Sequence, residues 1–327
     1  MIVEPKVREF ICTTAHPQGC KENVREQIAY VKEQGITGGP KKVLVIGAST
    51  GYGLASRITS AFGCHAATLG IMFEKPSNGK RTATPGWYNT AAFEEEAAKE
   101  GLYAKSINGD AFSKEVKEQA ISIIKEDLGK VDMVIYSLAA PRRTDAQGKM
   151  WVSTLKTTDK PFTEKSLDLR TNTIVTKTVE PAEEGELEGT VKVMGGEDWM
   201  DWIDALKAAD VLEKDAVTVA YSYIGPELTY PIYYDGTIGQ AKRHLTKTAG
   251  EINEKYEDVK AYISVNKALV TQASAAIPIV PLYFAILYKV MKEQGTHEGC
   301  IQQIARLFKD KLLVEQVPAD EKYQIRM

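Results

Sequence analysis

Residues 43–53 place an apolar run directly before a glycine-rich turn, and this segment limits the fold more than any other part of the chain. Val43–Ile46 predicts a buried strand, and the spacing Gly-x3-Gly-x-Gly follows at Gly47, Gly51 and Gly53. We expect Gly47 to form a tight turn, Gly51 to let the backbone approach a pyrophosphate, and Gly53 to let the next helix pack closely. A glycine triplet alone is also compatible with a plain turn. Its context, a strand before and a helix after, favours a dinucleotide site with phosphates at the helix N-terminus.

The second predicted strand, residues 66–74, ends in a carboxylate. Glu74 lies about twenty residues beyond the turn, where an acidic residue accepts hydrogen bonds from the adenosine ribose. This position favours NADH, because the charge would repel the 2′-phosphate of NADPH. Lys75 would offset part of that repulsion, so NADPH stays an alternative. The simpler interpretation of Glu74 is a solvated strand end.

Further strands alternate with helices along the chain, which predicts an α/β fold built on a doubly wound parallel sheet of the Rossmann type. Two of them run into segments that we expect at the ligand-binding edge of the sheet, Gly109–Ala111 and Ala139–Pro141. The further strands are predicted at residues 102–107, 131–138, 216–223 and 261–265.

The length of 327 residues and this alternation favour one elaborated domain. We expect an N-terminal lead-in over residues 1–40, with one helix at 23–33, and a single Rossmann-type domain over 41–327. The segment from about 141 to 215 is longer than one crossover helix requires and predicts an insertion. The insertion is predicted to hold a two-stranded hairpin (162–167 and 171–179), an acidic loop (183–188) and a helix that begins at 197.

Charge and hydropathy exclude several classes of partner. The net charge is −3 and no basic stripe is present, so neither nucleic acid nor an anionic membrane is expected to bind. Residues 275–290 form the longest apolar stretch, but Pro278, Pro281 and Lys289 interrupt it and it is too short to span a bilayer. We interpret it as a buried helix or a lid. The first residues show no secretory signal.

Cysteine usage indicates a reducing compartment, and hence a cytoplasmic protein, because four unpatterned cysteines do not form a disulfide scaffold. Cys12, His16 and Cys20 are spaced at four residues and could in principle bind zinc. No fourth ligand lies nearby in the sequence, and structural zinc sites favour closer cysteine pairs. We therefore expect no metal.

Reduction beside a nicotinamide needs an acid, and short-chain dehydrogenases use Tyr-x3-Lys on one helix face. Two such pairs occur here, Tyr256 with Lys260 and Tyr288 with Lys292. The first lies just before the strand at 261–265, at the sheet edge opposite the cofactor, and the second comes a full helix after that strand. We interpret both pairs as structural or surface pairs.

Tyr233 and Lys242 follow the fifth strand and are separated by eight residues. Nine steps of about 100° on one helix would point the two side chains in opposite directions. They can cooperate only if the helix begins near Thr237 and Tyr233 belongs to the preceding loop, which Pro231 and Asp235–Gly236 favour. The simpler interpretation of Tyr233 is a buried tyrosine. Of Tyr221 and Tyr223, the later one is expected to reach the cleft.

Together, six segments resemble the family of trans-2-enoyl-CoA reductases and FabV-type enoyl-ACP reductases along essentially the whole chain. That family is an enlarged relative of the short-chain dehydrogenases, and the eight-residue spacing from Tyr233 to Lys242 is its distinguishing mark. Family members usually continue for some tens of residues beyond the region matching 323–327, so this chain looks short at its C-terminus. The matching segments are 47–53, 136–141, 192–199, 220–225, Tyr233-x8-Lys242 and 264–274.

The resemblance implies that Tyr233 is the proton donor, that Lys242 binds the cofactor ribose and holds the phenol in its acidic role, and that Tyr223 binds the thioester carbonyl. It also implies Ser274 at the substrate. The implied NADH-binding residues, besides Lys242, are Gly47, Ala48, Ser49, Thr50, Gly51, Tyr52, Phe73, Glu74, Asp110, Ala111, Leu138, Ala139, Thr271, Gln272 and Ala273.

The implied activity is NADH-dependent reduction of the 2,3 double bond of trans-2-enoyl thioesters, carried by coenzyme A or by acyl carrier protein, in fatty acid metabolism. Two alternatives stay open. One is a related reductase of ketones or ketoacyl thioesters with the same cofactor, and the other is a non-catalytic NADH-binding protein. We expect a monomer or a dimer.

Overall fold

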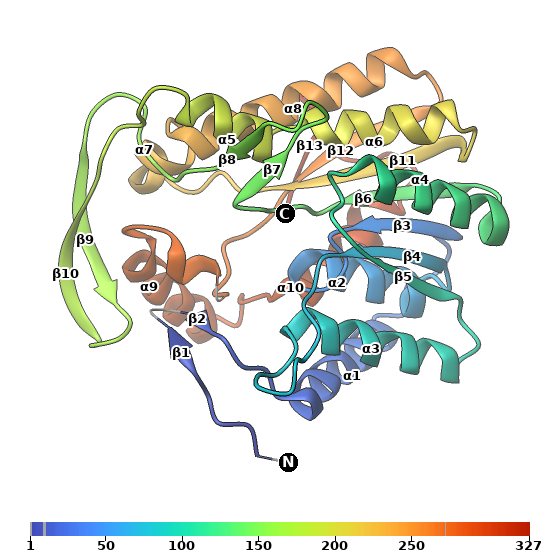
Figure 1. Ribbon diagram of the computed structural model, residues 1–327, viewed down its shortest axis with the longest axis horizontal. Coiled ribbons are helices and arrows are strands. Elements are labelled where there is room, and N and C mark those ends of the chain that lie inside the picture. The colour runs from blue at the N-terminus through green and yellow to red at the C-terminus, as the bar shows by residue number, and fades with distance from the viewer. Residues whose placement is uncertain (1, 9–10, 272) are drawn as a thin grey trace.

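A seven-stranded parallel sheet forms the centre of the molecule (Figure 1). The computed structural model describes residues 2–8, 11–271 and 273–327. The strand order is β13-β12-β11-β6-β3-β4-β5, and every neighbouring pair is parallel. The doubly wound fold class predicted from the sequence is thereby confirmed. The strands are β3 (Lys42–Ile46), β4 (Ala67–Met72), β5 (Ala104–Asn108), β6 (Val131–Tyr136), β11 (Leu212–Ser222), β12 (Val259–Val265) and β13 (Gln324–Arg326).

Helices cover both faces of this sheet, which is why its central strands are continuous apolar runs. On β3, Val43 and Val45 belong to one buried cluster, while Leu44 and Ile46 belong to the other. The first face packs on α1 (Pro17–Glu33), α2 (Gly51–Ile58), α3 (Pro85–Lys99) and α10 (Cys300–Leu307). The second packs on α4 (Lys114–Ile123), α6 (Glu197–Ala208) and α8 (Thr237–Lys255). π-helical turns extend α2, α4 and α10, at Thr59–Gly63, Ile124–Leu128 and Phe308–Leu312.

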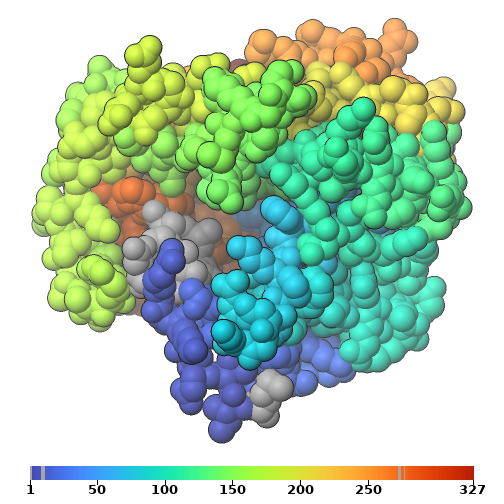
Figure 2. Space-filling model, viewed as in Figure 1, coloured from blue at the N-terminus to red at the C-terminus, as the bar shows by residue number. Residues whose placement is uncertain are grey.

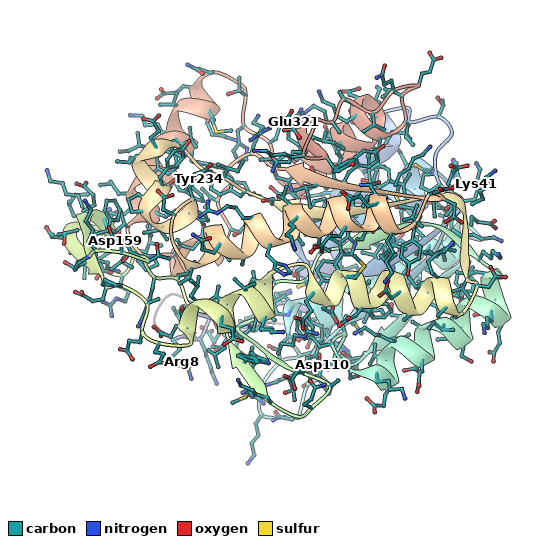
Figure 3. All side chains as sticks on the ribbon, turned by 90° about the horizontal axis from the view of Figure 1, so that it is seen from above. Arg8, Lys41, Asp110, Asp159, Tyr234 and Glu321 are labelled. Atoms are coloured by element: carbon teal, nitrogen blue, oxygen red, sulfur yellow. The ribbon has the colours of Figure 1, made fainter. Side chains whose placement is uncertain are left out.

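The inserted hairpin is present as β9 (Phe162–Asp168) and β10 (Thr173–Val179), which pair antiparallel from Phe162 opposite Val179. A second hairpin, β7 (Arg142–Thr144) with β8 (Met150–Val152), was not expected. The predicted acidic loop is wrong in its second half, because Glu186 begins α5 (Glu186–Met194). Acidic residues stabilise a first helical turn, so the same charges fit a helix start. α5 and α6 follow one another in line beside α8 (Figure 3).

The lead-in differs from its prediction in two ways. α1 begins at Pro17, six residues before the expected start, because His16 caps it by accepting a hydrogen bond of 3.1 Å from the Gly19 amide and Pro17 suits the first helical position. Two short strands, β1 (Val7–Arg8) and β2 (Ile11–Cys12), precede it.

The C-terminal third builds the region around the candidate site. After β11 come a 3-10 turn (Glu227–Thr229) and the short α7 (Tyr230–Tyr233). After β12 come a 3-10 turn (Ala273–Ala276) and α9 (Val280–Glu293). α9 is the helix expected in the apolar stretch, but it is only partly buried, since Ile286 is 58% exposed. Over the described ranges, no helix is both long and apolar enough to cross a bilayer.

Candidate active site

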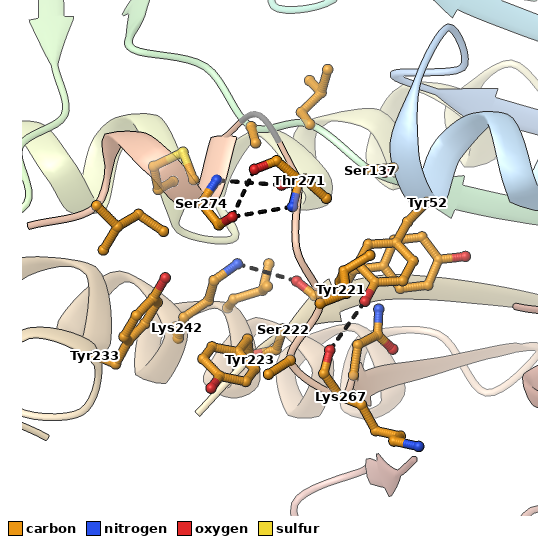
Figure 4. A pocket seen from close by; sticks show the side chains of 18 of the residues that line it. Tyr52, Ser137, Tyr221, Ser222, Tyr223, Tyr233, Lys242, Lys267, Thr271 and Ser274 are labelled. Carbon is orange, nitrogen blue, oxygen red and sulfur yellow. Dashed lines mark hydrogen bonds between the residues drawn. The ribbon is translucent and has the colours of Figure 1, made fainter. Parts of the chain in front are cut away.

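A pocket of about 260 Å³ opens at the carboxyl ends of β6, β11 and β12 (Figure 4). This is the edge at which open parallel sheets bind ligands. α8 and α9 supply its other walls. On the face seen in Figure 2, green residues of the β7–β8 hairpin and cyan residues of the loop after β4 border a recess. Eight of the residues assigned to the site from the sequence line the pocket: Tyr52, Leu138, Ala139, Tyr223, Tyr233, Lys242, Thr271 and Ser274. Tyr221 lines it as well, so the expectation that only Tyr223 of these two tyrosines reaches the cleft is wrong.

The glycine-rich turn lies at the end of β3 and fits a dinucleotide. Gly47 has φ +84°, and a Cβ there would lie 2.4 Å from the Ser137 carbonyl oxygen. A Cβ on Gly53 would lie 1.9 Å from the Gly47 carbonyl oxygen, so only glycine lets α2 pack this close to the strand. Gly51 has φ +56° and open space where a side chain would stand. The turn therefore leaves room for a pyrophosphate against the first amides of α2.

Contacts with the neighbouring strands hold the rest of the turn. The Ala48 amide donates a hydrogen bond of 2.8 Å to the Ile71 carbonyl oxygen. Thr50 is the extended N-cap residue of α2. The Ser49 hydroxyl donates to Glu74 Oε1 at 2.6 Å, and the Ser49 carbonyl oxygen accepts from Asn89 at 3.1 Å. The turn and the end of β4 thus form one unit.

Glu74 lies beyond the end of β4, close to the N-terminus of α3. A Cβ on Gly86, in the first turn of that helix, would lie 2.0 Å from Glu74 Oε1. Both backbone groups of Glu74 bond to the side chain of Asn108 on β5, at 2.8 and 3.0 Å. Phe73 is 76% exposed beside it. The carboxylate is therefore held at the sheet edge next to an exposed aromatic ring.

Asp110 and Ala111 follow β5 and are fixed from the second face of the sheet. Asp110 accepts a hydrogen bond of 3.0 Å from the Phe112 amide. The Ala111 carbonyl oxygen accepts from Trp202 Nε1 at 3.1 Å and from Lys117 Nζ at 3.2 Å. This loop extends the sheet edge away from the pocket, beyond Glu74.

Tyr233 and Lys242 meet at the pocket as the predicted helix start requires. α8 begins at Thr237, and Tyr233 is the last residue of α7, a short helix where the sequence predicted a loop. In Figure 4 the Tyr233 hydroxyl points into the pocket next to Lys242. Burial raises the pKa of Tyr233 above its usual range, so the phenol stays protonated near neutral pH. Burial also lowers the pKa of Lys242 to about 8.

Tyr221, near the end of β11, and Tyr223, just after it, contact different partners. Tyr221 pairs with the Tyr52 ring at a centroid distance of 5.4 Å and shares a hydrogen bond of 2.5 Å with Ser56. Tyr223 packs edge-on against the Tyr233 ring at 5.0 Å. Figure 4 shows its hydroxyl pointing away from that of Tyr233. The pKa of Tyr223 is raised, mainly by burial and further by the Tyr283 hydroxyl.

The segment after β12 closes the pocket. Ser274 Oγ donates to the Thr271 carbonyl oxygen at 2.6 Å and accepts from the Thr271 amide at 3.1 Å. Ala273 begins the adjoining 3-10 turn, and Gln272 lies outside the described residues. Phe284 of α9 also lines the pocket, 6.2 Å from the Tyr223 ring.

Sequence reasoning did not single out Asn266, Lys267 or Phe284 as pocket residues, although all three line it. The position of Asn266 and Lys267 directly after β12 is the signal that could have found them, because ligands gather at strand ends. Phe284 lies within residues 275–290, the apolar stretch that the sequence indicated as a buried helix or a lid.

The Tyr-x3-Lys pairs lie elsewhere. Tyr256 bonds to Asp204 at 2.7 Å, and Lys260 pairs with Asp215 at 3.7 Å at the opposite edge of the sheet. Tyr288 on α9 packs edge-on against His297. In the part of the chain that the structure describes, no three His, Cys, Asp or Glu side chains gather as metal ligands would.

Two family models cover almost the whole chain. The NAD(P)H binding domain of trans-2-enoyl-CoA reductase matches residues 2–79, and the trans-2-enoyl-CoA reductase catalytic region matches residues 81–313. The chain belongs to the trans-2-enoyl-CoA reductase family.

Curated relatives in this family carry two names. The enoyl-[acyl-carrier-protein] reductase [NADH] of Flavobacterium johnsoniae is 59% identical, over all of this chain and 84% of the relative. The trans-2-enoyl-CoA reductase [NADH] of Clostridium perfringens is 63% identical, over 95% of this chain and 80% of the relative. The two names differ in the carrier of the substrate, acyl carrier protein or coenzyme A, and both include NADH.

Solved structures agree with this assignment. Treponema denticola trans-2-enoyl-CoA reductase in complex with NAD superposes with a TM-score of 0.96 at 51% identity, over all of this chain and 84% of that one. A short-chain dehydrogenase/reductase from Serratia marcescens shares the fold, with a TM-score of 0.53 at 12% identity over 88% of this chain and 96% of that one. The trans-2-enoyl-CoA reductase family thus has the enlarged dehydrogenase fold that the resemblance implied.

Proposed function

We propose that this protein reduces the 2,3 double bond of trans-2-enoyl thioesters with NADH. The observation that carries the proposal is the uncharged Tyr233 phenol, which points into the pocket beside Lys242 at the carboxyl edge of a dinucleotide-binding sheet. The names of the curated relatives support the same substrate class and the same cofactor.

The cofactor would extend along the sheet edge from Glu74 to the pocket. The glycine-rich turn from Gly47 to Tyr52 would hold the pyrophosphate, and Glu74 would accept hydrogen bonds from the adenosine ribose, with Ser49 orienting its carboxylate. The remaining proposed contacts are Phe73, Asp110, Ala111, Leu138, Ala139, Lys242, Thr271, Gln272 and Ala273. When bound, NADH supplies a hydride to the β-carbon of the substrate.

Residues of the protein would stabilise the negative charge that then develops on the thioester oxygen. A phenol that stays protonated can donate a hydrogen bond to that oxygen and then give its proton to the α-carbon, which completes the reduction, and this is the role we assign to Tyr233. Lys242, beside it, would bind the nicotinamide ribose and help to hold the phenol in its role as the acid. Tyr223 would bind the thioester carbonyl after turning from Tyr283 toward the pocket, and Ser274 would contact the substrate from the opposite wall.

We also propose a cytoplasmic enzyme that acts as a monomer or a dimer on coenzyme A or acyl carrier protein thioesters. Residues 1–40 would serve as a lead-in to a single reductase domain over 41–327. The four cysteines, few for this length, support a reducing compartment.

Tyr233→Phe tests the proposal. Oxidation of NADH by crotonyl-CoA, followed by absorbance, should nearly disappear in the variant, while NADH binding persists. NADPH and acetoacetyl-CoA are run alongside with the unchanged protein. Turnover of acetoacetyl-CoA in place of crotonyl-CoA would establish a carbonyl reductase, and NADH binding without any turnover would establish a binding protein. Full activity of Tyr233→Phe would exclude the assigned role of Tyr233.

A further inference from the structure

Gln303 on α10 is completely buried and makes hydrogen bonds to two separate parts of the pocket wall. Its Oε1 accepts from the Lys267 amide at 2.9 Å and from the Tyr52 hydroxyl at 3.1 Å. Its Nε2 donates to the carbonyl oxygens of Lys267 at 3.4 Å and Glu298 at 3.3 Å. Only this orientation of the amide satisfies all four partners, because a flipped amide would oppose N–H to N–H and oxygen to oxygen.

Two of these partner residues, Tyr52 and Lys267, each carry a part of the proposed site. Tyr52 follows Gly51 of the glycine-rich turn, and its hydroxyl shares its single hydrogen between Gln303 Oε1 at 3.1 Å and the Lys267 carbonyl oxygen at 3.3 Å (Figure 4). Lys267 begins the wall that continues through Thr271 and Ser274. One side chain therefore bonds both backbone groups of Lys267 and the hydroxyl of Tyr52.

Lys267 also joins the two ends of the chain segment that contains α9. We call residues 268–295 the α9 segment. Lys267, just before it, donates from Nζ to the Thr296 carbonyl oxygen at 2.8 Å and to Glu298 at 2.8 Å, just after it. Arg306 of α10 holds Glu298 with two bonds of 2.7 Å. Both ends of the α9 segment are thus tied together beside Gln303.

We propose that Gln303 is a positioning residue that couples the glycine-rich turn to the base of the α9 segment, so that it sets the affinity for NADH and for the acyl thioester together. The inference rests on the proposed function for its substrate. Gln303 does not line the pocket, and it acts through Tyr52 and Lys267. The coupling is reciprocal, since whatever orders one side of a shared hydrogen-bond network favours order on the other.

Gln303→Leu removes all four bonds and leaves an apolar side chain that is shorter by one heavy atom. We expect the dissociation constant of NADH, measured by fluorescence, and the KM of crotonyl-CoA each to rise about tenfold, with kcat changed much less. The control is Gln302→Leu, the same change one position earlier, which removes only the cap bond from the Gly299 amide. The control should leave both constants within about twofold, since a cap bond affects helix stability alone.

Gln303→Glu separates positioning from simple support of the fold. The introduced carboxylate would face the carbonyl oxygens of Lys267 and Glu298, whereas its protonated form supplies one O–H donor and so restores one of the two bonds that the glutamine amide donates there. We expect the loss of NADH affinity, relative to the unchanged protein, to be largest at pH 8 and to shrink as the pH falls toward 5.5, because burial raises the pKa of such a carboxyl group. A loss that does not vary with pH would overturn the inference.

Tyr52→Phe combined with Gln303→Leu completes the test. If the two residues act through one network, the double variant binds NADH more tightly than the product of the two single losses predicts. Independent losses, or an NADH dissociation constant within about twofold of the unchanged protein in Gln303→Leu, would also overturn the coupling. NADH binding is measured without turnover, so absence of crotonyl-CoA reduction by the unchanged protein would refute the proposed function and leave this comparison valid.

Discussion

Lys242 donates a hydrogen bond of 3.1 Å from its side-chain nitrogen to the backbone carbonyl oxygen of Tyr221. Burial lowers the pKa of Lys242 to about 8. The folded protein therefore holds a cation where water would solvate it better. Because burial of this cation costs free energy, the stability of the folded protein should depend on pH over the range in which Lys242 titrates.

The stability contributed by position 242 should rise with pH between about 8 and about 10.5. In that window the unfolded chain keeps the proton that the folded protein has released, so raising the pH favours folding. Below about pH 8 both states are charged and the full cost of burial applies. The shift corresponds to up to about 3 kcal/mol.

Urea denaturation of the unchanged protein and of Lys242→Met at pH 7.5 and pH 10 measures this effect as a difference, which cancels other titrating groups. We expect the variant to be the more stable of the two at pH 7.5 and to lose that advantage by pH 10. An advantage that is the same at both pH values would contradict the burial of a charged Lys242.

Glu74 should decide the choice between the two nicotinamide cofactors. Glu74→Gln removes the charge that repels a 2′-phosphate while keeping an acceptor for Ser49, so kcat/KM with NADPH should rise about tenfold relative to NADH. Glu74→Asp, which keeps the charge, is the control and should still disfavour NADPH. An unchanged ratio in Glu74→Gln would show that the charge of Glu74 does not decide between the two cofactors.

The buried pair of Lys117 and Asp198 supports the Asp110–Ala111 loop. Lys117 Nζ lies 2.7 Å from Asp198 and also donates to two loop carbonyl oxygens, while Tyr136 donates to the other Asp198 oxygen at 3.1 Å. Asp198 is only 2% exposed. We expect Asp198→Asn or Lys117→Met to lower the free energy of unfolding by about 3–5 kcal/mol, since each leaves an unpaired buried group.

The exposed pair of Lys114 and Glu118, on the same helix, is the matched control, and its removal should cost less than about 1 kcal/mol. In urea denaturation the double variant Lys117→Met with Asp198→Asn should lose less than the sum of the two single variants. Additive losses would show that the two groups do not depend on each other.

Much of the fold could be predicted because buried parallel strands are continuous apolar runs, as in Val43–Ile46, and because the glycine spacing has a steric cause. Helix geometry set the condition under which Tyr233 and Lys242 could meet, a helix that begins near Thr237, and the family resemblance pointed to this pair. Gln303 could not be predicted, since its partner Tyr52 lies 251 positions away and only packing brings them together. The edge-on packing of Tyr223 against Tyr233 likewise depends on tertiary structure, which no local pattern indicates.

In Gly53→Ala, helix propensity and packing have opposite effects on the free energy of unfolding, and the effect of packing should be the larger. Alanine in place of glycine inside a helix usually stabilises it by about 1 kcal/mol. Here the added Cβ would lie 1.9 Å from the Gly47 carbonyl oxygen, so α2 must move away from the turn at the end of β3. We expect a loss of several kcal/mol, about 3 or more, in the free energy of unfolding, together with a large loss of NADH affinity. Gly51→Ala, where nothing obstructs a side chain but φ is +56°, is the control and should cost only about 1 kcal/mol. A Gly53→Ala variant as stable as the unchanged protein would show that α2 does not need this close contact.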